Sequence, residues 1–435
     1  MLKIKAELKP QKNVVTSFFP INTRDRKDIF DWDVVLGHFV KFAYRKNVSL
    51  NQVDKFKDKC KDLFESKLDE KQFWNHIESM YFNGNELYKI SPELLLFKAH
   101  ELKGSSANKR LGDLFLNMLQ DFHLTSSPKL SLNFLENEIV EVFRSFVKSG
   151  QNAGTITEAA KESTYLPFLS ANFTKDLEFL ASRPKYFLDT ITDFLKLYAF
   201  LYTAQLTLNI DEWKSGEPTP KPCFFILDTE KASDERTFVK SFGYRQLANN
   251  FSKLFPYLAM NESIQDPGSK KEPIWKVAQR LPGTGSTYLL NNYAEEFKDN
   301  RQLKTKIDSG SNELEALSNL LRLSHDQFKR GESRHEINLH YCRAIESELC
   351  GHFVQNRGRA GRVLVFNQDY ILLLTNLAIG NDERLRLHEL ITRFEARGVN
   401  FDKQTQKLLV NFYERIGNVE RMSDSGDAVY VRKTV

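Results

Sequence analysis

The sequence has few cysteines and no long apolar run, and these two absences exclude several classes of protein. Its four cysteines, Cys60, Cys223, Cys342 and Cys350, are widely spaced, which excludes a disulfide framework and favours a reducing compartment. The apolar run Ile371–Leu374 is far too short to span a bilayer. No apolar stretch of signal-peptide type follows the first residues. We therefore expect a cytoplasmic protein without membrane contact.

A strong charge of either sign is also missing. Lysine and arginine number 62 against 57 aspartates and glutamates, a net charge of +5. This balance permits an anionic partner such as DNA but lacks the sharp basic bias of a non-specific nucleic-acid binder. The chain is 41% hydrophobic and contains 34 phenylalanines, so it has ample material for a folded core. Its 435 residues are enough for two or three domains.

Recognisable catalytic motifs are lacking too. The strand-like segment Cys223–Leu227 runs into Asp228 and Glu230, as strands of ATPases and magnesium nucleases do. The glycine-rich loop that an ATPase needs is absent, and Lys231 directly follows the second acid, whereas a nuclease motif places its lysine two residues beyond. Solvated acids at a strand end are the simpler interpretation. A magnesium-dependent nuclease that uses Asp228 and Glu230 remains an alternative.

The histidines and cysteines between residues 335 and 352 do not have metal-binding spacing. His335 and His340 are five residues apart, so on a helix they diverge by about 140° and cannot share an ion. No C-x-x-C pair accompanies them. We therefore expect no metal and no cofactor.

Apolar periodicity predicts a mainly α protein with a helical N-terminal domain at residues 1–150. The small polar residues at 149–154 mark its end. Residues 151–310 form a second helical domain with one short buried strand at 223–228. Residues 311–368 then form a helical connector that carries a basic loop, and residues 369–435 form the last domain.

The last domain has the pattern of a winged helix-turn-helix. Tyr370–Leu377 and Leu387–Phe394 place apolar groups on one helical face each, with a short strand at 385–387 between them. Asp402 can cap a third helix that runs to Ile416. Two strands joined by the turn Asp424–Asp427 complete the pattern. Such a fold can insert its second paired helix into a DNA major groove.

The residues expected to contact DNA belong to three groups. The predicted recognition helix presents Lys403, Gln404, Gln406, Lys407 and Asn411. A glycine-spaced basic loop and the wing supply groups for phosphates, namely Arg357, Arg359, Arg362, Arg421 and Arg432. The loop arginines are equally compatible with a solvated surface loop, and nearby acids offset the charge of the last domain. Winged helices also serve as protein-docking modules, so a scaffold without DNA contact remains open.

Several segments resemble the DptG family (also called DndG), a component of bacterial phosphorothioation-dependent restriction systems. They are Phe30–Gly37, Tyr165–Leu169, Phe225–Thr237, Leu254–Leu258 and Gly417–Ala428. The resemblance implies a non-catalytic subunit of a phage-defence complex that acts on DNA lacking backbone sulfur. It also implies two partners, the ATPase subunit DptF and the helicase-like subunit DptH. The alternative within the same assembly is a subunit that docks the ATPase without touching DNA.

Overall fold

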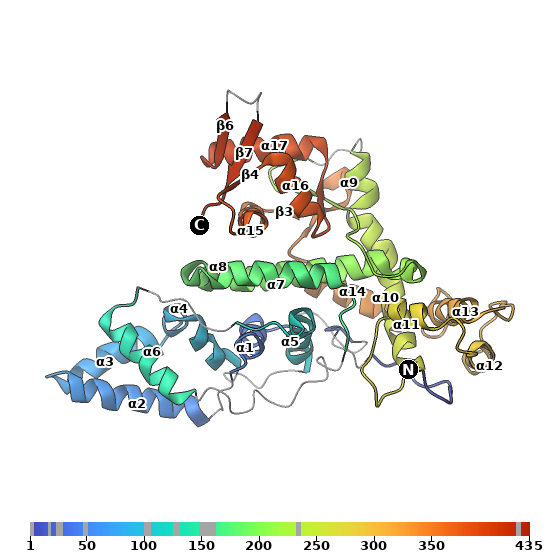
Figure 1. The fold of residues 1–435 in the computed structure, drawn as a ribbon, viewed down its shortest axis with the longest axis horizontal. Coiled ribbons are helices and arrows are strands. Elements are labelled where there is room, and N and C mark those ends of the chain that lie inside the picture. The colour runs from blue at the N-terminus through green and yellow to red at the C-terminus, as the bar shows by residue number, and fades with distance from the viewer. Residues whose placement is uncertain are drawn as a thin grey trace.

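The protein is mainly helical, as the sequence predicts, and its described residues form two small sheets (Figure 1). The computed structural model describes residues 4–15, 19–22, 29–46, 51–99, 106–124, 131–147, 162–231, 236–422 and 428–435. The long helices α7 and α8 cross the middle of the molecule. The N-terminal helices lie on one side of them and the C-terminal segment on the other (Figure 1).

The N-terminal region is built from short helices that converge on an aromatic core. Asp31 caps α1 by accepting hydrogen bonds from two backbone amides, and Asn133 forms a capping box at the start of α6. The ring of Phe39 lies 5.9 Å from that of Phe115 and 6.1 Å from that of Phe173 in α7, which joins this region to the centre. The elements are α1 (Trp32–Ala43), α2 (Asn51–Lys67), η1 (Lys71–Phe73), α3 (Trp74–Ile77), η2 (Glu78–Phe82), α4 (Leu87–Ile90), η3 (Pro92–Ala99), α5 (Ser106–Leu119) and α6 (Phe134–Phe146).

Helix α8 is the centre of the fold because its second half is buried on all sides. Nearly every side chain from Phe194 to Thr207 is enclosed, as expected for a helix that is apolar around its whole circumference. It packs against helices α1, α7, α10 and α15. The central helices are α7 (Pro167–Ala181), α8 (Pro184–Asn209), η5 (Ile210–Ser215), α9 (Thr237–Phe242), α10 (Tyr244–Ile264), α11 (Ile274–Arg280), α12 (Thr287–Arg301), α13 (Glu313–Asp326), α14 (His335–Ala344) and η6 (Ile345–Cys350).

The predicted buried strand at 223–228 is present as β1 (Cys223–Leu227), and it lies inside a four-stranded sheet. The sheet order is β2-β3-β1-β5, formed with β2 (Val354–Asn356), β3 (Arg362–Phe366) and β5 (Val399–Phe401). Strand β1 runs parallel to both β3 and β5. This sheet therefore joins three segments that the sequence divides at residues 310 and 368.

The C-terminal segment contains the helices and strands that the sequence predicts, with one addition. The residues between α16 and α17 form strand β5 and pair with β1, so they are more than a turn. Strands β4, β7 and β6 form an antiparallel sheet in that order. The predicted turn at 424–427 and the predicted linker at 149–154 lie outside the described residues. The elements are η7 (Gly358–Ala360), α15 (Gln368–Ile379), β4 (Arg384–Arg386), α16 (Leu387–Glu395), α17 (Lys403–Arg415), β6 (Val419–Met422) and β7 (Ala428–Arg432).

A buried ion pair fastens the C-terminal segment to the central helices. Arg397, just after α16, donates two hydrogen bonds to Asp176 of α7, with distances of 2.8 and 2.5 Å. The Tyr198 hydroxyl of α8 donates a third to the same carboxylate at 2.5 Å. Burial, together with the neighbouring Asp176 charge, raises the pKa of Tyr198 and keeps its proton in place.

Among the residues that the structure describes, no helix combines the length and the apolar composition needed to cross a lipid bilayer.

Candidate nucleic-acid interface

Helix α17 starts from a well-defined cap at the end of β5. Asp402 accepts a hydrogen bond from the backbone amide of Thr405 at 2.9 Å. Its carboxylate also accepts two from the Arg236 guanidinium, at 2.9 and 2.6 Å. Although burial raises the pKa of Asp402, these hydrogen bonds leave it below its usual value. The helix start is therefore held by an ion pair with the loop that follows β1.

The inner side of α17 packs into the core and leaves the other side in solvent. Leu409, Phe412 and Tyr413 are buried, and the Tyr413 hydroxyl lies 2.6 Å from that of Thr375 in α15. Four of the five predicted recognition residues are exposed on the outer side, and none has a hydrogen bond or ion pair to the described part of the chain. They are Lys403, Gln404, Lys407 and Asn411.

Gln406 does not belong to this exposed set. It is half-buried, and its amide donates a hydrogen bond to the Phe401 carbonyl at 2.8 Å. The amide thus ties the first turn of α17 to the end of β5. Sequence periodicity alone places Gln406 beside Lys403 and Lys407, whereas the backbone carbonyl that it meets is a tertiary feature.

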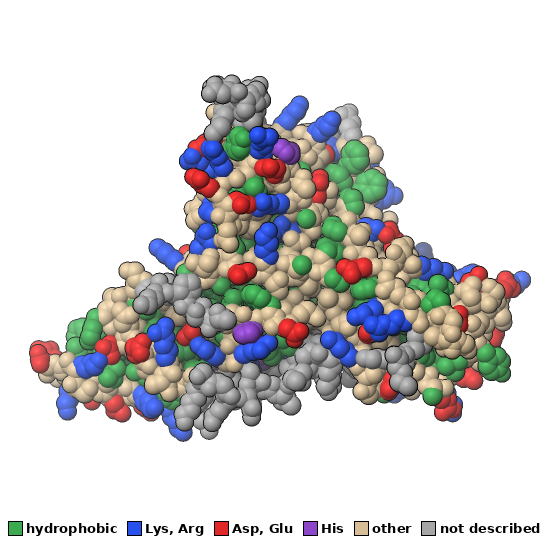
Figure 2. All heavy atoms as spheres, viewed as in Figure 1, with side chains coloured by type: hydrophobic (Ala, Val, Ile, Leu, Met, Phe, Trp, Pro, Cys, Tyr) green, Lys and Arg blue, Asp and Glu red, His purple; other side chains and the backbone are tan. Residues whose placement is uncertain are grey.

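The arginines of the β6–β7 hairpin are paired within the domain. Arg421 is bound to Glu414 of α17, and Arg432 is bound to Glu420 across the hairpin. Both arginines are exposed, with 60% and 48% of their side chains accessible, so a phosphate can still reach them. Figure 2 shows Lys and Arg side chains protruding over this part of the molecule, with acidic side chains between them. The positive charge of the hairpin surface is therefore interrupted by carboxylates.

The basic loop precedes β3, and two of its three arginines are engaged within the chain. Arg357 donates a hydrogen bond to the Asp228 carbonyl at 2.7 Å. Arg362 is paired with Glu346 and donates to the Tyr244 hydroxyl at 3.0 Å. Arg359 is exposed and has no partner among the described residues. In the sheet, β3 is the neighbour of β1 on one side, and β5 is its neighbour on the other. Because β5 leads into α17, the basic loop and α17 belong to opposite sides of β1.

The acids after β1 differ from the pair of solvated side chains expected at a strand end. The Glu230 carboxylate is fully buried and accepts hydrogen bonds from the Leu227 amide at 2.8 Å and from Thr405 at 3.2 Å. It also pairs with Arg236 at 2.5 Å. Both of its oxygens are thus occupied, which does not fit the two-acid magnesium site of the nuclease alternative. Asp228 beside it is half-buried.

The described ranges contain no candidate metal site. No set of three or more His, Cys, Asp or Glu side chains there is placed to hold an ion. Near the histidine cluster, burial raises the pKa of the Cys342 thiol to about 12, so this sulfur is a poor ligand at neutral pH.

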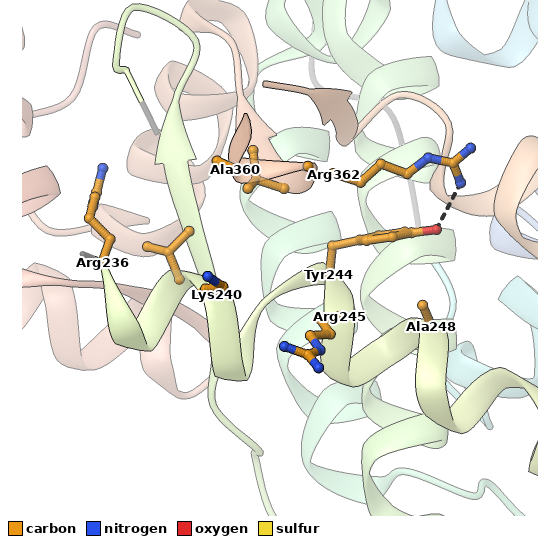
Figure 3. Close-up of a pocket in the computed structure, with 10 residues that line it drawn as sticks. Arg236, Lys240, Tyr244, Arg245, Ala248, Ala360 and Arg362 are labelled. Carbon is orange, nitrogen blue, oxygen red and sulfur yellow. Dashed lines mark hydrogen bonds between the residues drawn. The ribbon is translucent and has the colours of Figure 1, made fainter. Parts of the chain in front are cut away.

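A basic cleft of about 370 Å³ lies between α9, the start of α10 and the loop before β3 (Figure 3). It is not among the sites predicted from the sequence. Four cationic residues line it, and none of its described lining residues is an Asp or a Glu. The signal in the sequence is the alternation of aromatic and basic residues from 238 to 245. The lining residues are Arg236, Val239, Lys240, Tyr244, Arg245, Ala248, Ala360, Gly361, Arg362 and Val363.

No model of a known protein family matches the chain, and a search of curated proteins finds no match either.

Proposed function

We propose that residues 369–435 form a winged helix-turn-helix and that helix α17 contacts duplex DNA. The order of elements supports this assignment: a helix, a strand, a pair of helices and a hairpin. The antiparallel pairing of β4 with β7 also supports it. In a winged helix, the short strand between the first two helices pairs with a strand of the C-terminal hairpin in this way. The short strand β5 inside the helix pair is a departure that connects the domain to β1.

The single observation that carries the proposal is the exposed outer side of α17. Positions 403, 404, 407 and 411 follow one side of the helix, and their side chains have no partner within the described part of the chain. Two of them are lysines, which bind phosphates. The other two carry an amide, which can donate to and accept from a base edge in the major groove. An exposed row of this kind has no structural use inside the domain.

The assembly is proposed from the resemblance to the DptG family. In it, the chain is a non-catalytic subunit that delivers unmodified DNA to the ATPase subunit DptF and the helicase-like subunit DptH. The buried and occupied Glu230 supports a non-catalytic role over the nuclease alternative. The segments 30–37, 165–169, 225–237, 254–258 and 417–428 carry the resemblance.

A second candidate is a scaffold whose C-terminal domain docks on the ATPase subunit without touching DNA. The ion pairs Arg421–Glu414 and Arg432–Glu420 favour it, because they neutralise the wing that would otherwise approach the phosphates. In this candidate the exposed row on α17 contacts a protein surface.

The test is a salt titration of duplex binding by the full chain and by a double charge reversal, Lys403→Glu with Lys407→Glu. Each phosphate contact contributes about 0.9 to the slope of log affinity against log salt, so the loss of two contacts reduces the slope by about 1.8. Affinity at low salt falls as well. The proposal is wrong if affinity and slope remain those of the unmodified chain, and the scaffold candidate is then favoured.

The matched control is Lys55→Glu with Lys71→Glu, two exposed lysines of the N-terminal region without partners among the described residues. Either double variant lowers the net charge from +5 by four, to +1. A non-specific charge effect therefore weakens DNA binding equally in both. Deletion of residues 350–435 is not a usable test, because it removes β2, β3 and β5 and leaves β1 without a sheet.

A further inference from the structure

Helix α9 exposes two aromatic rings side by side. Phe238 is 55% and Phe242 42% exposed, and their ring centroids lie 6.2 Å apart on consecutive turns. Phe224 of β1 stacks on Phe238 from below, with centroids 5.3 Å apart and an angle of 27° between the rings. Figure 2 shows hydrophobic side chains gathered over this helix. One face of Phe238 is thus supported by protein, and its exposed part is open to a ligand.

Only part of each ring is used to pack α9 on the sheet. The inner side of α9 contributes Val239, which packs with Ile226, Val363 and Val365 in a small cluster on the sheet, separate from the main core. A helix of six residues is enough to cover that cluster. Phe238 and Phe242 lie on one flank of the helix, where both contact Phe224 while much of each side chain is left in solvent.

Cationic groups lie on another flank of α9 from the rings, because residues two positions apart on a helix do not face each other. Lys240 of α9 and Arg245 of α10 line the basic cleft, and Figure 3 shows them beside Tyr244. Arg245 is exposed and has no partner among the described residues. Arg236 and Arg362 also line the cleft, but their ion pairs with Glu230 and Glu346 occupy them. The cleft therefore offers at least one uncommitted cation on the flank of α9 away from the two aromatic rings, with no carboxylate among its described lining residues.

We infer that α9 and the basic cleft form a binding site for single-stranded nucleic acid. The strand crosses α9, with bases stacked on Phe238 and Phe242 on one flank and phosphates held by Lys240 and Arg245 on the other. Aromatic rings with positive charge beside them are the usual combination in proteins that bind single strands. The charge of the cleft favours this ligand over an apolar protein segment, which needs no cations. The inference stands apart from the duplex contact of α17, since it rests on other residues.

The binding test uses a fluorescein-labelled single-stranded oligothymidylate and the full chain, read by fluorescence anisotropy. The double variant Phe238→Ala with Phe242→Ala lowers affinity about 25-fold or more, because each stacked base contributes on the order of fivefold at the weakest. Phe238→Trp retains binding, and the new indole emission is quenched when a base stacks on it. Arg245→Gln reduces the salt slope by about 0.7, the share of one phosphate contact on a single strand.

A leucine pair, Phe238→Leu with Phe242→Leu, separates stacking from apolar contact. Leucine keeps the apolar surface but has no π-face, so its affinity for the oligonucleotide falls nearly as far as that of the alanine pair. Equal binding by the leucine pair and the unmodified chain shows that stacking is not involved and overturns the inference. Absence of oligonucleotide binding by the unmodified chain overturns it as well. Duplex binding that depends on Lys403 and Lys407 is unaffected by all of these variants, which keeps the two sites distinguishable.

Discussion

Replacement of Arg397 by methionine tests whether the buried ion pair holds the C-terminal segment on the central helices. The accessible fraction is 3% for the Arg397 side chain and 0% for that of Asp176. Arg397 also donates to the Arg393 carbonyl at 2.7 Å, so its guanidinium is almost fully used. The methionine side chain fills much of the same space without the charge.

The expected loss of stability follows from what remains after the substitution. Asp176 keeps its hydrogen bond from Tyr198 but loses its only cationic partner among the described residues, inside a closed site. Breaking a buried pair by removal of one member costs about 3–5 kcal/mol, because the remaining charge is buried without compensation. Replacement of both members, as Arg397→Met with Asp176→Leu, costs far less because no charge is left behind.

The assay is urea unfolding of the unmodified chain, both single variants and the double variant, followed by tryptophan fluorescence. Non-additivity of the two single effects measures their coupling. Lys89→Met is the control: the Lys89–Glu86 pair spans 2.6 Å but is more than half exposed, so its loss costs at most about 1 kcal/mol. The reasoning is refuted if Arg397→Met costs no more than this control, or if the single effects are simply additive.

Two further substitutions test the backbone and the helix cap. Gly398→Ala lowers the free energy of unfolding by more than the roughly 1–2 kcal/mol that a left-handed alanine costs, because the new Cβ lies 2.0 Å from the buried Gln205 amide. The control is Gly417→Ala, where φ is similar but no atom lies within 4 Å of the new Cβ, so only the conformational cost is measured. Both variants are compared by urea unfolding. Because the pKa of Asp402 is lowered in the folded protein, its contribution to stability is complete above its ordinary pKa of 3.8 and is lost as the pH falls through the lower folded value. Asp402→Asn therefore reduces the drop in urea midpoint between pH 5 and pH 3, and an unchanged drop contradicts the role of the Arg236 pair.

Much of the local structure was predictable from the sequence because it depends on neighbouring residues. The apolar stripes of α15, α16 and α17 mark their buried sides, and Asp402 immediately before α17 predicts the cap that the structure contains. The exposed positions 403, 404, 407 and 411 follow from the same periodicity. The mainly α composition was likewise evident, since strand-like alternation is scarce.

The tertiary structure alone decided which of these pieces meet. The continuous apolar run Cys223–Leu227 marks a buried strand but contains no information on its partners β3 and β5, which come from the far end of the chain. The pairing of β1 with β5 brings Glu230, Arg236 and Asp402 into one buried network. Glu230, a candidate metal ligand in the sequence, is therefore a structural residue in the fold. Helical periodicity extends over a few residues, whereas burial and charge pairing depend on contacts between segments that lie hundreds of residues apart.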